Sequence, residues 1–375
     1  MHIPNSVELE FNPARDDLGK GKELRDGLSV ALQIGDSLWV ANDETLSLER
    51  LSRIDAAVPG NYRFDQHRQF SLADYLRLPV APPDDPADLE EVDVEGLDYA
   101  DGYLWLVGSH SLKRNKPSLK DGNKAARKQL AKVRADGNRY LLARIPVVQV
   151  DGSCTLAKEV TQKGVQRSAA QLRGNARGNA LTEALRGDKH LGAFLAIPGK
   201  DNGFDIEGLA VVGKRLFLGL RGPVLGGWAV ILEVELKQQG KQPSTLRLQP
   251  IGPKQRLYRK HFLQLGGLGI RDVCKQGSDL LILAGPTMAL DGPVTIFRWR
   301  NGAAPKDEGL VADDALERVL EVPYGHAADH AEGMTLFSAD GGTAHALLVV
   351  YDAASPRRQL GKSTALADVF PLPRR

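Results

Sequence analysis

Four acidic residues recur in one local setting, directly before a glycine and a short apolar run. They are Asp26, Glu95, Glu207 and Glu332, and a fifth copy of the pattern has Leu268 in that place. Carboxylates that point at one centre repel each other, so they coexist only with a cation, an arginine or raised pKa values. We predict that these four acids hold a metal ion, and Ca2+ fits best because it takes six to eight oxygen ligands. Alternatively, each carboxylate accepts backbone N–H bonds from a neighbouring strand, or the acids belong to a ligand site.

A second set of polar residues stands near the acids or where the following apolar run ends. The set comprises Asn42, Asp43, His110, Arg221, Arg271 and His330. A guanidinium binds an anionic group in a bidentate manner, so we expect the two arginines to hold a ligand, together with the Asn-Asp pair. The two histidines are candidate proton carriers, because histidine titrates near neutral pH. The stretch HAADHAE around the second histidine has metal-ligand spacing only on a helix, yet it precedes a predicted strand.

The elements that must position these residues are pairs of short strands. Each copy joins two apolar runs, such as LWLV and LFLGL, through a turn, and Asp101-Gly102 has the strongest two-residue hairpin chemistry. The runs are almost continuously apolar, which indicates strands covered on both faces. Third strands are predicted in TLSLERLSRI, YLLARIPVVQV, WAVILEVEL and VTIFRWR, and outer strands in RLQPI and LERVLEVP.

Repeated four-stranded sheets that bury their faces against neighbours make a β-propeller. We therefore predict an all-β fold, with residues 1–375 forming a single propeller domain of five blades. Six blades are the alternative if the 112-residue separation between Gly96 and Gly208 hides a divergent one. The last copy has room for only three strands, so the N-terminal SVELEFN is expected to close the ring as its outer strand. A β-sandwich or two smaller barrels are the structural alternatives.

In a propeller, the first strand of each blade lines the central channel. The second strand runs antiparallel to it, so its end returns to the face where the first strand began. The acids before the glycines and the polar residues after the second runs should therefore meet at one mouth of the channel. The sequence predicts one charged site at that mouth.

Two insertions with helical residues interrupt the strand pattern. Residues 112–139 hold ten Lys or Arg and two Asp, a net charge of +8, and predict an exposed basic helix or loop. Residues 161–195 contain a predicted packing helix near Asn179 to Arg186, because Leu181, Ala184 and Leu185 have helical spacing. The basic insertion lacks the aromatic residues that stack on bases, so nucleic acid is disfavoured as a partner and this insertion is its one candidate contact.

The whole chain has a formal net charge of +2, which gives no global argument for nucleic acid or a membrane. No secretory signal and no run of about 18 apolar residues is visible, so we expect a cytoplasmic protein without a membrane partner. Cys154 and Cys274 are expected to be reduced thiols. The phosphate-binding loop, the serine-hydrolase elbow and the HExxH zinc motif are all missing from the sequence.

Several stretches together resemble the domain-of-unknown-function family 3616, over roughly residues 20–355. They are DNGFDIEGLAV, LFLGLRGPVLGGWAVILEVEL, VEGLDY, LWLVGSHSLKR and GIRDV. The resemblance implies a bacterial β-propeller-like protein without an established activity. A looser likeness is to calcium-dependent propeller hydrolases, including five-bladed calcium-dependent nucleotidases and gluconolactonase-like enzymes. In the latter, a Glu-Gly pair starts an inner strand and the Glu binds the central metal. Glu95, Glu207 and Glu332 match that placement, although leucine or methionine follows the glycine where those enzymes commonly have proline.

The function expected from these patterns is binding of a small anionic ligand or a protein partner at the charged mouth. The first alternative is a calcium-dependent hydrolase of phosphate esters or lactones, in which the ion would polarise the scissile group and activate a water. The second alternative is a purely structural interaction module.

Overall fold

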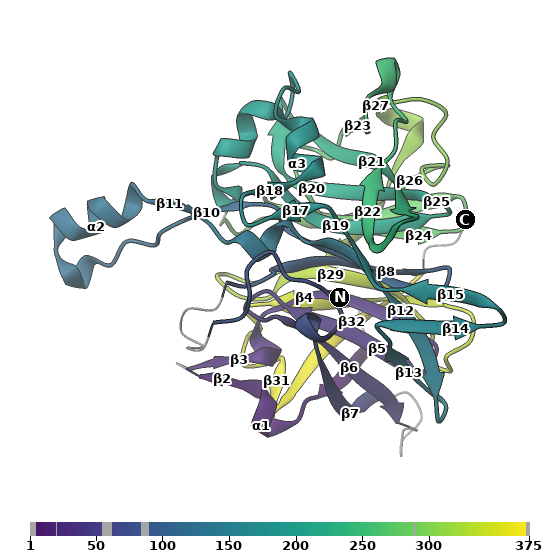
Figure 1. The fold of residues 1–375 in the computed structure, drawn as a ribbon. Helices are drawn as coiled ribbons and strands as arrows, with labels where there is room; N and C mark the ends of the chain where they lie inside the picture. Colours follow the sequence, from purple (N-terminus) through teal and green to yellow (C-terminus); the bar gives the residue numbers. More distant parts are fainter. Residues whose placement is uncertain (1–4, 20, 55–61, 84–89, 289, 373–375) are drawn as a thin grey trace.

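The computed structural model describes residues 5–19, 21–54, 62–83, 90–288 and 290–372, so both ends of the predicted 1–375 domain lie partly outside the described residues. Strands dominate this part of the chain, and they form antiparallel sheets that follow one another along the sequence (Figure 1). The predicted all-β propeller is confirmed by the arrangement of these sheets around a ring of inner strands.

The ring consists of the first strand of each sheet in the described residues. These strands are β4 (Leu28–Ile34), β8 (Val94–Ala100), β19 (Asp205–Val212), β24 (Gly269–Gln276) and β29 (His330–Phe337). Each inner strand packs beside the next one in this order, and β29 packs beside β4. The inner strands therefore surround one central axis.

Three further strands complete each sheet. In the first sheet they are β5 (Ser37–Asn42), β6 (Ser47–Ile54) and β7 (Tyr62–Ser71), and in the second β9 (Tyr103–Gly108), β12 (Leu142–Val150) and β16 (Ala170–Leu172). The third sheet has β20 (Arg215–Leu225), β21 (Trp228–Gln239) and β22 (Gln242–Leu248), with β23 (Arg259–Leu263) beside the other half of β21. The fourth has β25 (Asp279–Gly285), β26 (Val294–Trp299) and β28 (Leu316–Val322). The predicted third strands and the outer strand LERVLEVP lie within these elements or extend at most two residues beyond them, whereas RLQPI overlaps β22 only at Arg247 and Leu248.

The fifth sheet is completed by the first strand of the chain. After β30 (Ala346–Asp352) and β32 (Thr364–Pro371) comes β1 (Asn5–Glu10), which pairs antiparallel with β32. Strand β1 also pairs in parallel with β7 of the first sheet, so it joins the last sheet to the first. The predicted closure of the ring by the N-terminal strand is confirmed by this pairing.

Short elements decorate the sheets at their edges and turns. The strands are β2 (Asp17–Gly19), β3 (Lys22–Glu23), β10 (Leu112–Arg114), β11 (Val133–Ala135), β13 (Ser153–Leu156), β14 (Glu159–Gln162), β15 (Val165–Ser168), β17 (Gly174–Asn175), β18 (Gly178–Asn179), β27 (Gly309–Val311) and β31 (Gln359–Leu360). The helices are α1 (Pro13–Asp16), α2 (Asn123–Leu130) and α3 (Ala180–Leu185).

Apolar clusters fill the spaces between neighbouring sheets, including the space between the fifth sheet and the first. Strand β5 shows how one strand serves two clusters. Leu38 and Val40 pack toward the fifth sheet, whereas Trp39 and Ala41 pack toward the second. Successive side chains of a strand point to opposite faces, so a strand between two cores is apolar throughout. This explains the continuous apolar runs in the sequence.

All five inner strands have a β-bulge near their start. The pairing register skips one residue in each, and these residues are Ser29, Glu95, Glu207, Arg271 and Glu332. The three glutamates are thus structurally equivalent, as predicted. In the first and fourth sheets, however, the equivalent residues are Ser29 and Arg271 rather than Asp26 and Leu268. The alignment of Gly27 and Gly269 with the other glycines was therefore wrong by three residues in each case.

The glycine after each bulged glutamate lets neighbouring inner strands approach closely. A Cβ atom at Gly333 would lie 2.6 Å from the Cα atom of Val30 and 2.9 Å from the backbone nitrogen of Ala31. Both atoms belong to the backbone of β4, so relief would require one inner strand to move away from the next. The Glu-Gly pair thus combines a bulged acid with a close strand contact.

Substituting Gly333→Ala is expected to lower the free energy of unfolding by about 1–3 kcal/mol, because overpacking at this contact displaces backbone. Urea denaturation measures the effect. Gly309→Ala is the matched control, since a Cβ atom there meets nothing within 4 Å. Equal stability of the two variants would contradict the close-contact explanation.

The first insertion stands outside the four-stranded sheets, whereas the second, residues 161–195, includes β16, the outer strand of the second sheet. Helix α2 stands at the tip of the hairpin formed by β10 and β11 and extends away from the sheets (Figure 1). Only Ala126 of this helix is buried. In the second insertion, Asn179 caps α3, and Leu181 and Leu185 are buried against the core between the second and third sheets. The packing helix predicted near Asn179 to Arg186 is confirmed.

Candidate functional site

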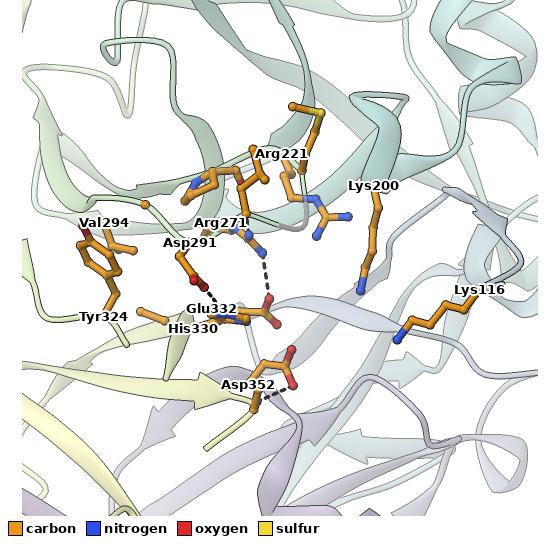
Figure 2. Close-up of a pocket in the computed structure, with 16 residues that line it drawn as sticks. Lys116, Lys200, Arg221, Arg271, Asp291, Val294, Tyr324, His330, Glu332 and Asp352 are labelled. Carbon is orange, nitrogen blue, oxygen red and sulfur yellow. Dashed lines mark hydrogen bonds and ion pairs between the residues drawn. The ribbon is translucent and has the colours of Figure 1, made fainter. Parts of the chain in front are cut away.

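A cavity of about 250 Å³ opens where β24 and β29 begin. Figure 2 shows charged side chains from several segments around it, among them Lys116 on the basic insertion, Lys200 in the loop before β19, and Arg221 on β20. The remaining charged lining residues are Arg271, Asp291, His330, Glu332 and Asp352. The predicted site at the channel mouth therefore coincides with a cavity, and several predicted residues line it.

Two arginines hold the acids on one side of this mouth. Arg221 forms an ion pair with Asp205, and its Nη1 atom lies 2.5 Å from Oε1 of Glu207. Arg271 Nη1 lies 3.1 Å from Oε2 of Glu207 and 2.8 Å from Oε1 of Glu332. Glu207 is therefore held between two guanidinium groups. Burial would lower the pKa of Arg221, but the carboxylates of Asp205 and Glu207 raise it overall.

A third arginine, which the sequence did not single out, holds another acid of the mouth. Arg139 Nη1 lies 2.9 Å from Oδ2 of Asp93, and its Nη2 lies 2.6 Å from Oε1 of Glu91. Its Nη1 also donates a hydrogen bond to Oγ of Ser111 at 2.6 Å. Arg139 is the last residue of the basic insertion, so these contacts fix the base of this insertion beside the second sheet.

Three carboxyl groups near the mouth form no ion pair within the described residues: Asp43, Glu95 and Asp352. Glu95 is 7% exposed and has no hydrogen-bond partner in the described part of the chain. Burial, and then the charges of Asp93 and Glu207, raise its pKa well above the usual range. Burial, with Asp93 and Asp352, raises the pKa of Asp43 to about 7. These carboxyl groups thus lack the arginine partners that Asp205, Glu207 and Glu332 have.

The pKa of Glu332 illustrates the balance at the mouth. Burial and the charge of Asp352 raise it, while Arg271 opposes the shift without cancelling it. Acids at the mouth are thus accommodated in two of the ways that the sequence suggested, by arginines and by raised pKa values.

The expected Ca2+ ion does not fit the four proposed ligands as they are placed. Asp26 lies before β4 and accepts a hydrogen bond from Gln359, whereas Glu207 and Glu332 are occupied by Arg271. The described residues contain no group of three or more His, Cys, Asp or Glu side chains that could hold a metal ion. A bound Ca2+ ion stays a prediction.

Carboxylates that accept backbone N–H bonds from a neighbouring inner strand do occur, but at other positions. Asp98 accepts from the backbone N–H of Val211 at 2.6 Å, and Asp272 accepts from that of Met334 at 2.7 Å. Both acids lie deeper along the channel than the bulged residues. The alternative in which carboxylates accept backbone N–H bonds from a neighbouring strand therefore applies to a second layer of acids, Asp98 and Asp272.

The two candidate histidines lie in different settings. His110 is buried, its Nδ1 atom lies 2.7 Å from the carbonyl oxygen of Gly108, and its Nε2 lies 2.7 Å from Nδ2 of Asn179. Burial lowers the pKa of His110 to about 4, so it is neutral at pH 7. His330 lines the cavity, with Nε2 3.5 Å from Oδ1 of Asp291. The structure thus brings His330 to the mouth and leaves His110 in a structural contact.

The two residues of the predicted Asn-Asp pair, Asn42 and Asp43, also lie in different settings. Asn42 donates a hydrogen bond from Nδ2 to the carbonyl oxygen of Leu24, and its Oδ1 accepts one from the backbone N–H of Glu44. These bonds order the turn after β5. Asp43, in contrast, lies within electrostatic reach of Asp93, Asp352 and Lys200.

Two lysines of the cavity were missed by the sequence analysis. Lys116 belongs to the basic insertion, which was considered only as a whole, and Lys200 stands in the loop PGKDNG directly before an inner strand. A search of every loop that precedes an inner strand would have found Lys200, because such loops open onto the same mouth.

Fold and site together define a β-propeller with a charged cavity at one mouth of its ring. The chain belongs to the family described as "Protein of unknown function (DUF3616)", whose sequence model matches residues 27–368. The resemblance noted in the sequence is thereby confirmed. Comparison with curated proteins finds no match.

Several solved structures are similar to this chain at low sequence identity. A putative oxidoreductase (glucose dehydrogenase) from Thermus thermophilus is 12% identical, with a TM-score of 0.36 and coverage of 94% of this chain and 98% of that one. Sqt1 from Saccharomyces cerevisiae is 8% identical, with a TM-score of 0.34 and full coverage of both chains. The PQQ-bound aldose sugar dehydrogenase from Streptomyces coelicolor is 10% identical, with a TM-score of 0.32 and coverage of 98% and 100%. All three TM-scores are below 0.5, so these proteins do not bear on the activity of this chain.

Among the described residues, none of the helices has the length and apolar character needed to cross a membrane.

Proposed function

We propose that this propeller binds a small ligand at its charged mouth, through a carboxylate or phosphate group of that ligand. The observation that carries the proposal is the convergence of four cationic side chains on one cavity. They are Lys116, Lys200, Arg221 and Arg271 (Figure 2).

The two lysines are the groups best placed to receive an anion. Within the described residues, neither Lys116 nor Lys200 forms a hydrogen bond or an ion pair, and both side chains are exposed. The arginines behind them are fixed by Glu207 and its neighbours, so their positions are set before a ligand arrives. Fixed donors beside movable, unpaired lysines suit recognition of an anionic group.

The size of the cavity limits the ligand. Pockets for drug-sized molecules enclose about 300–1,000 Å³, and the cavity here encloses about 250 Å³. A compact metabolite fits such a space, with the exposed apolar residues Met288, Leu290 and Tyr324 at its rim. We propose binding rather than calcium-dependent hydrolysis, because the described residues contain no group of three or more His, Cys, Asp or Glu side chains placed to hold a metal ion.

Calorimetric titration with inorganic phosphate and with butyrate tests the proposal. Both anions are expected to bind, and the double variant Lys116→Ala/Lys200→Ala is expected to bind about tenfold more weakly, since each exposed charge contributes about 0.5–1 kcal/mol. Lys214→Ala is the control, because Lys214 is exposed in the turn between β19 and β20, at the other end of the inner strand. Absence of anion binding by the unmodified protein, or equal weakening by Lys214→Ala, would refute the proposed site.

A further inference from the structure

The mouth cavity has an apolar wall as well as a charged one. The apolar residues that line the cavity are Pro286, Met288, Leu290, Val294, Tyr324 and Ala331. Figure 2 shows Tyr324 and Val294 on one side of the cavity, and Lys116 and Lys200 on the other. The cavity is therefore amphipathic, with ammonium groups on one side and apolar side chains on the other.

Three large apolar side chains of this wall are exposed. Leu290 is 60% exposed, Tyr324 is 48% exposed and Met288 is 44% exposed. Single exposed apolar residues are common on protein surfaces, but a group of them around one cavity is typical of a binding site. An apolar group of a ligand would remove these side chains from contact with water, which is favourable.

The apolar wall is held in shape by a contact between the two loops that form it. Met288 and Leu290 lie in the loop between β25 and β26, whereas Tyr324 lies in the loop between β28 and β29. Asp291 of the first loop accepts a hydrogen bond from the backbone N–H of Ala327 in the second loop, at 2.9 Å. The three exposed side chains therefore belong to one joined wall rather than to two independent loops.

Arg271 connects this wall to the charged part of the mouth. Its Nη2 atom donates a hydrogen bond of 3.0 Å to the carbonyl oxygen of Pro286, where the first loop begins, and its Nη1 atom lies 2.8 Å from Oε1 of Glu332. Between the two, Val294 and Ala331 are buried in the apolar cluster between the fourth and fifth sheets. The apolar wall and the charged residues are thus fixed relative to each other before a ligand binds.

We infer that the ligand of this cavity is an amphiphilic anion, that is, a carboxylate or phosphate that carries an alkyl chain or a ring. Its anionic group contacts Lys116 and Lys200, and its apolar group contacts Met288, Leu290 and Tyr324. This inference rests on the proposed function, to which it adds the apolar part of the ligand. A fully polar anion would leave the apolar side chains in water, and an uncharged apolar molecule would gain nothing from the two ammonium groups.

A series of straight-chain carboxylates tests the inference. Calorimetric titration compares acetate, butyrate and hexanoate, which share one anionic group and differ only in apolar length. A methylene group that becomes fully buried raises the affinity about fourfold, and one that becomes half buried raises it about twofold. Hexanoate has four more methylene groups than acetate, so we expect it to bind at least about tenfold more tightly. Hexan-1-ol has the same number of carbons without the charge and is expected to bind more weakly than hexanoate.

The double variant Leu290→Ser/Tyr324→Ser then tests which side chains contact the alkyl chain. It is expected to reduce the preference for hexanoate over acetate to about threefold or less, because less apolar surface is left to cover. The matched control is Leu310→Ser/Tyr99→Ser, which replaces the same two residue types. Leu310 and Tyr99 are also exposed and do not line the cavity, so the control should keep the full preference.

The possible failures are distinguishable. If phosphate and the carboxylates bind but hexanoate binds no more tightly than acetate, the amphiphile inference is overturned while the anion site stands. If neither phosphate nor any carboxylate binds, or if hexan-1-ol binds as tightly as hexanoate, the proposed function itself fails. If the preference exists but Leu290→Ser/Tyr324→Ser keeps it in full, the assignment of the alkyl chain to this wall is overturned.

Discussion

Substituting Arg271→Met is expected to lower the free energy of unfolding by about 3–5 kcal/mol. The guanidinium group of Arg271 is buried and neutralises parts of Glu207 and Glu332, and it also donates a hydrogen bond to the carbonyl oxygen of Pro286 at 3.0 Å. Its removal leaves the largely buried carboxyl group of Glu332 without an ion pair and leaves Glu207 with Arg221 alone of its two arginines, which costs far more than the loss of an exposed ion pair. Urea denaturation followed by circular dichroism measures the change.

Two further variants determine whether the effect arises from the ion pairs. Arg186→Met removes an exposed pair with Glu183 and is expected to change the free energy of unfolding by less than about 1 kcal/mol. Arg271→Met combined with Glu332→Gln is expected to recover part of the loss, because the carboxyl group left without an ion pair is then gone. A double variant as unstable as Arg271→Met alone would show that packing, and not charge, is what Arg271 contributes.

The protein is expected to become less stable as the pH rises from 6.5 to 8. Burial, with neighbouring acids, raises the pKa of Asp43 to about 7 and raises those of Glu95 and Glu332 well above the usual range. A carboxyl group with a raised pKa keeps its proton in the folded state when the unfolded state has lost it. The contribution of such a group to the free energy of unfolding is therefore complete below its ordinary pKa. It then decreases steadily as the pH rises from the ordinary pKa to the raised one.

The free energy of unfolding is expected to fall by at most about 1.4 kcal/mol per pH unit for each carboxyl group that keeps its proton in the folded state. The range begins at pH 6.5 because the lowered pKa of His110, which burial brings to about 4, gives the opposite trend between pH 4 and 6.5. Denaturation at both pH values is compared for the unmodified protein and for Glu95→Gln. The variant should show a weaker dependence, and an equal or steeper one would contradict the assignment to this carboxyl group.

The sequence predicted the second strands of the sheets well because they are covered on both faces, as in β5, β9 and β25. Strand β5, with Trp39 on one side and Val40 on the other, reads as a continuous apolar run that ends in polar turn residues. Local turn chemistry such as Asp101-Gly102 then separates the strands of a hairpin. The N-terminal strand could be placed as well, because the last copy of the pattern lacked one strand.

The candidate site was only partly predictable because its geometry depends on register. The bulge that aims Glu95 and Glu207 at the axis is visible in the strand pairing, but in the first and fourth sheets an acid or a glycine happens to stand three residues earlier. The sequence therefore suggested Asp26, whereas Arg271 occupies the ring position. Lys116 was hidden for another reason, since it comes from the basic insertion, whose path over the mouth no local pattern reveals, whereas Lys200 stands in the loop before β19, outside the repeated strand pattern.

The position of β1 between β32 and β7 has a consequence for how the protein assembles during synthesis. Asn5 pairs with Val369, so β1 leaves the ribosome long before the strand β32 with which it pairs. Contacts between such distant segments slow folding, because the chain must close a very long loop before they form. Until then, the growing chain exposes the unpaired edge of β1, and the apolar cluster between the fifth sheet and the first lacks one wall. The strand that closes the ring thus also keeps an unpaired edge for a long time, and this edge can pair with strands of other chains.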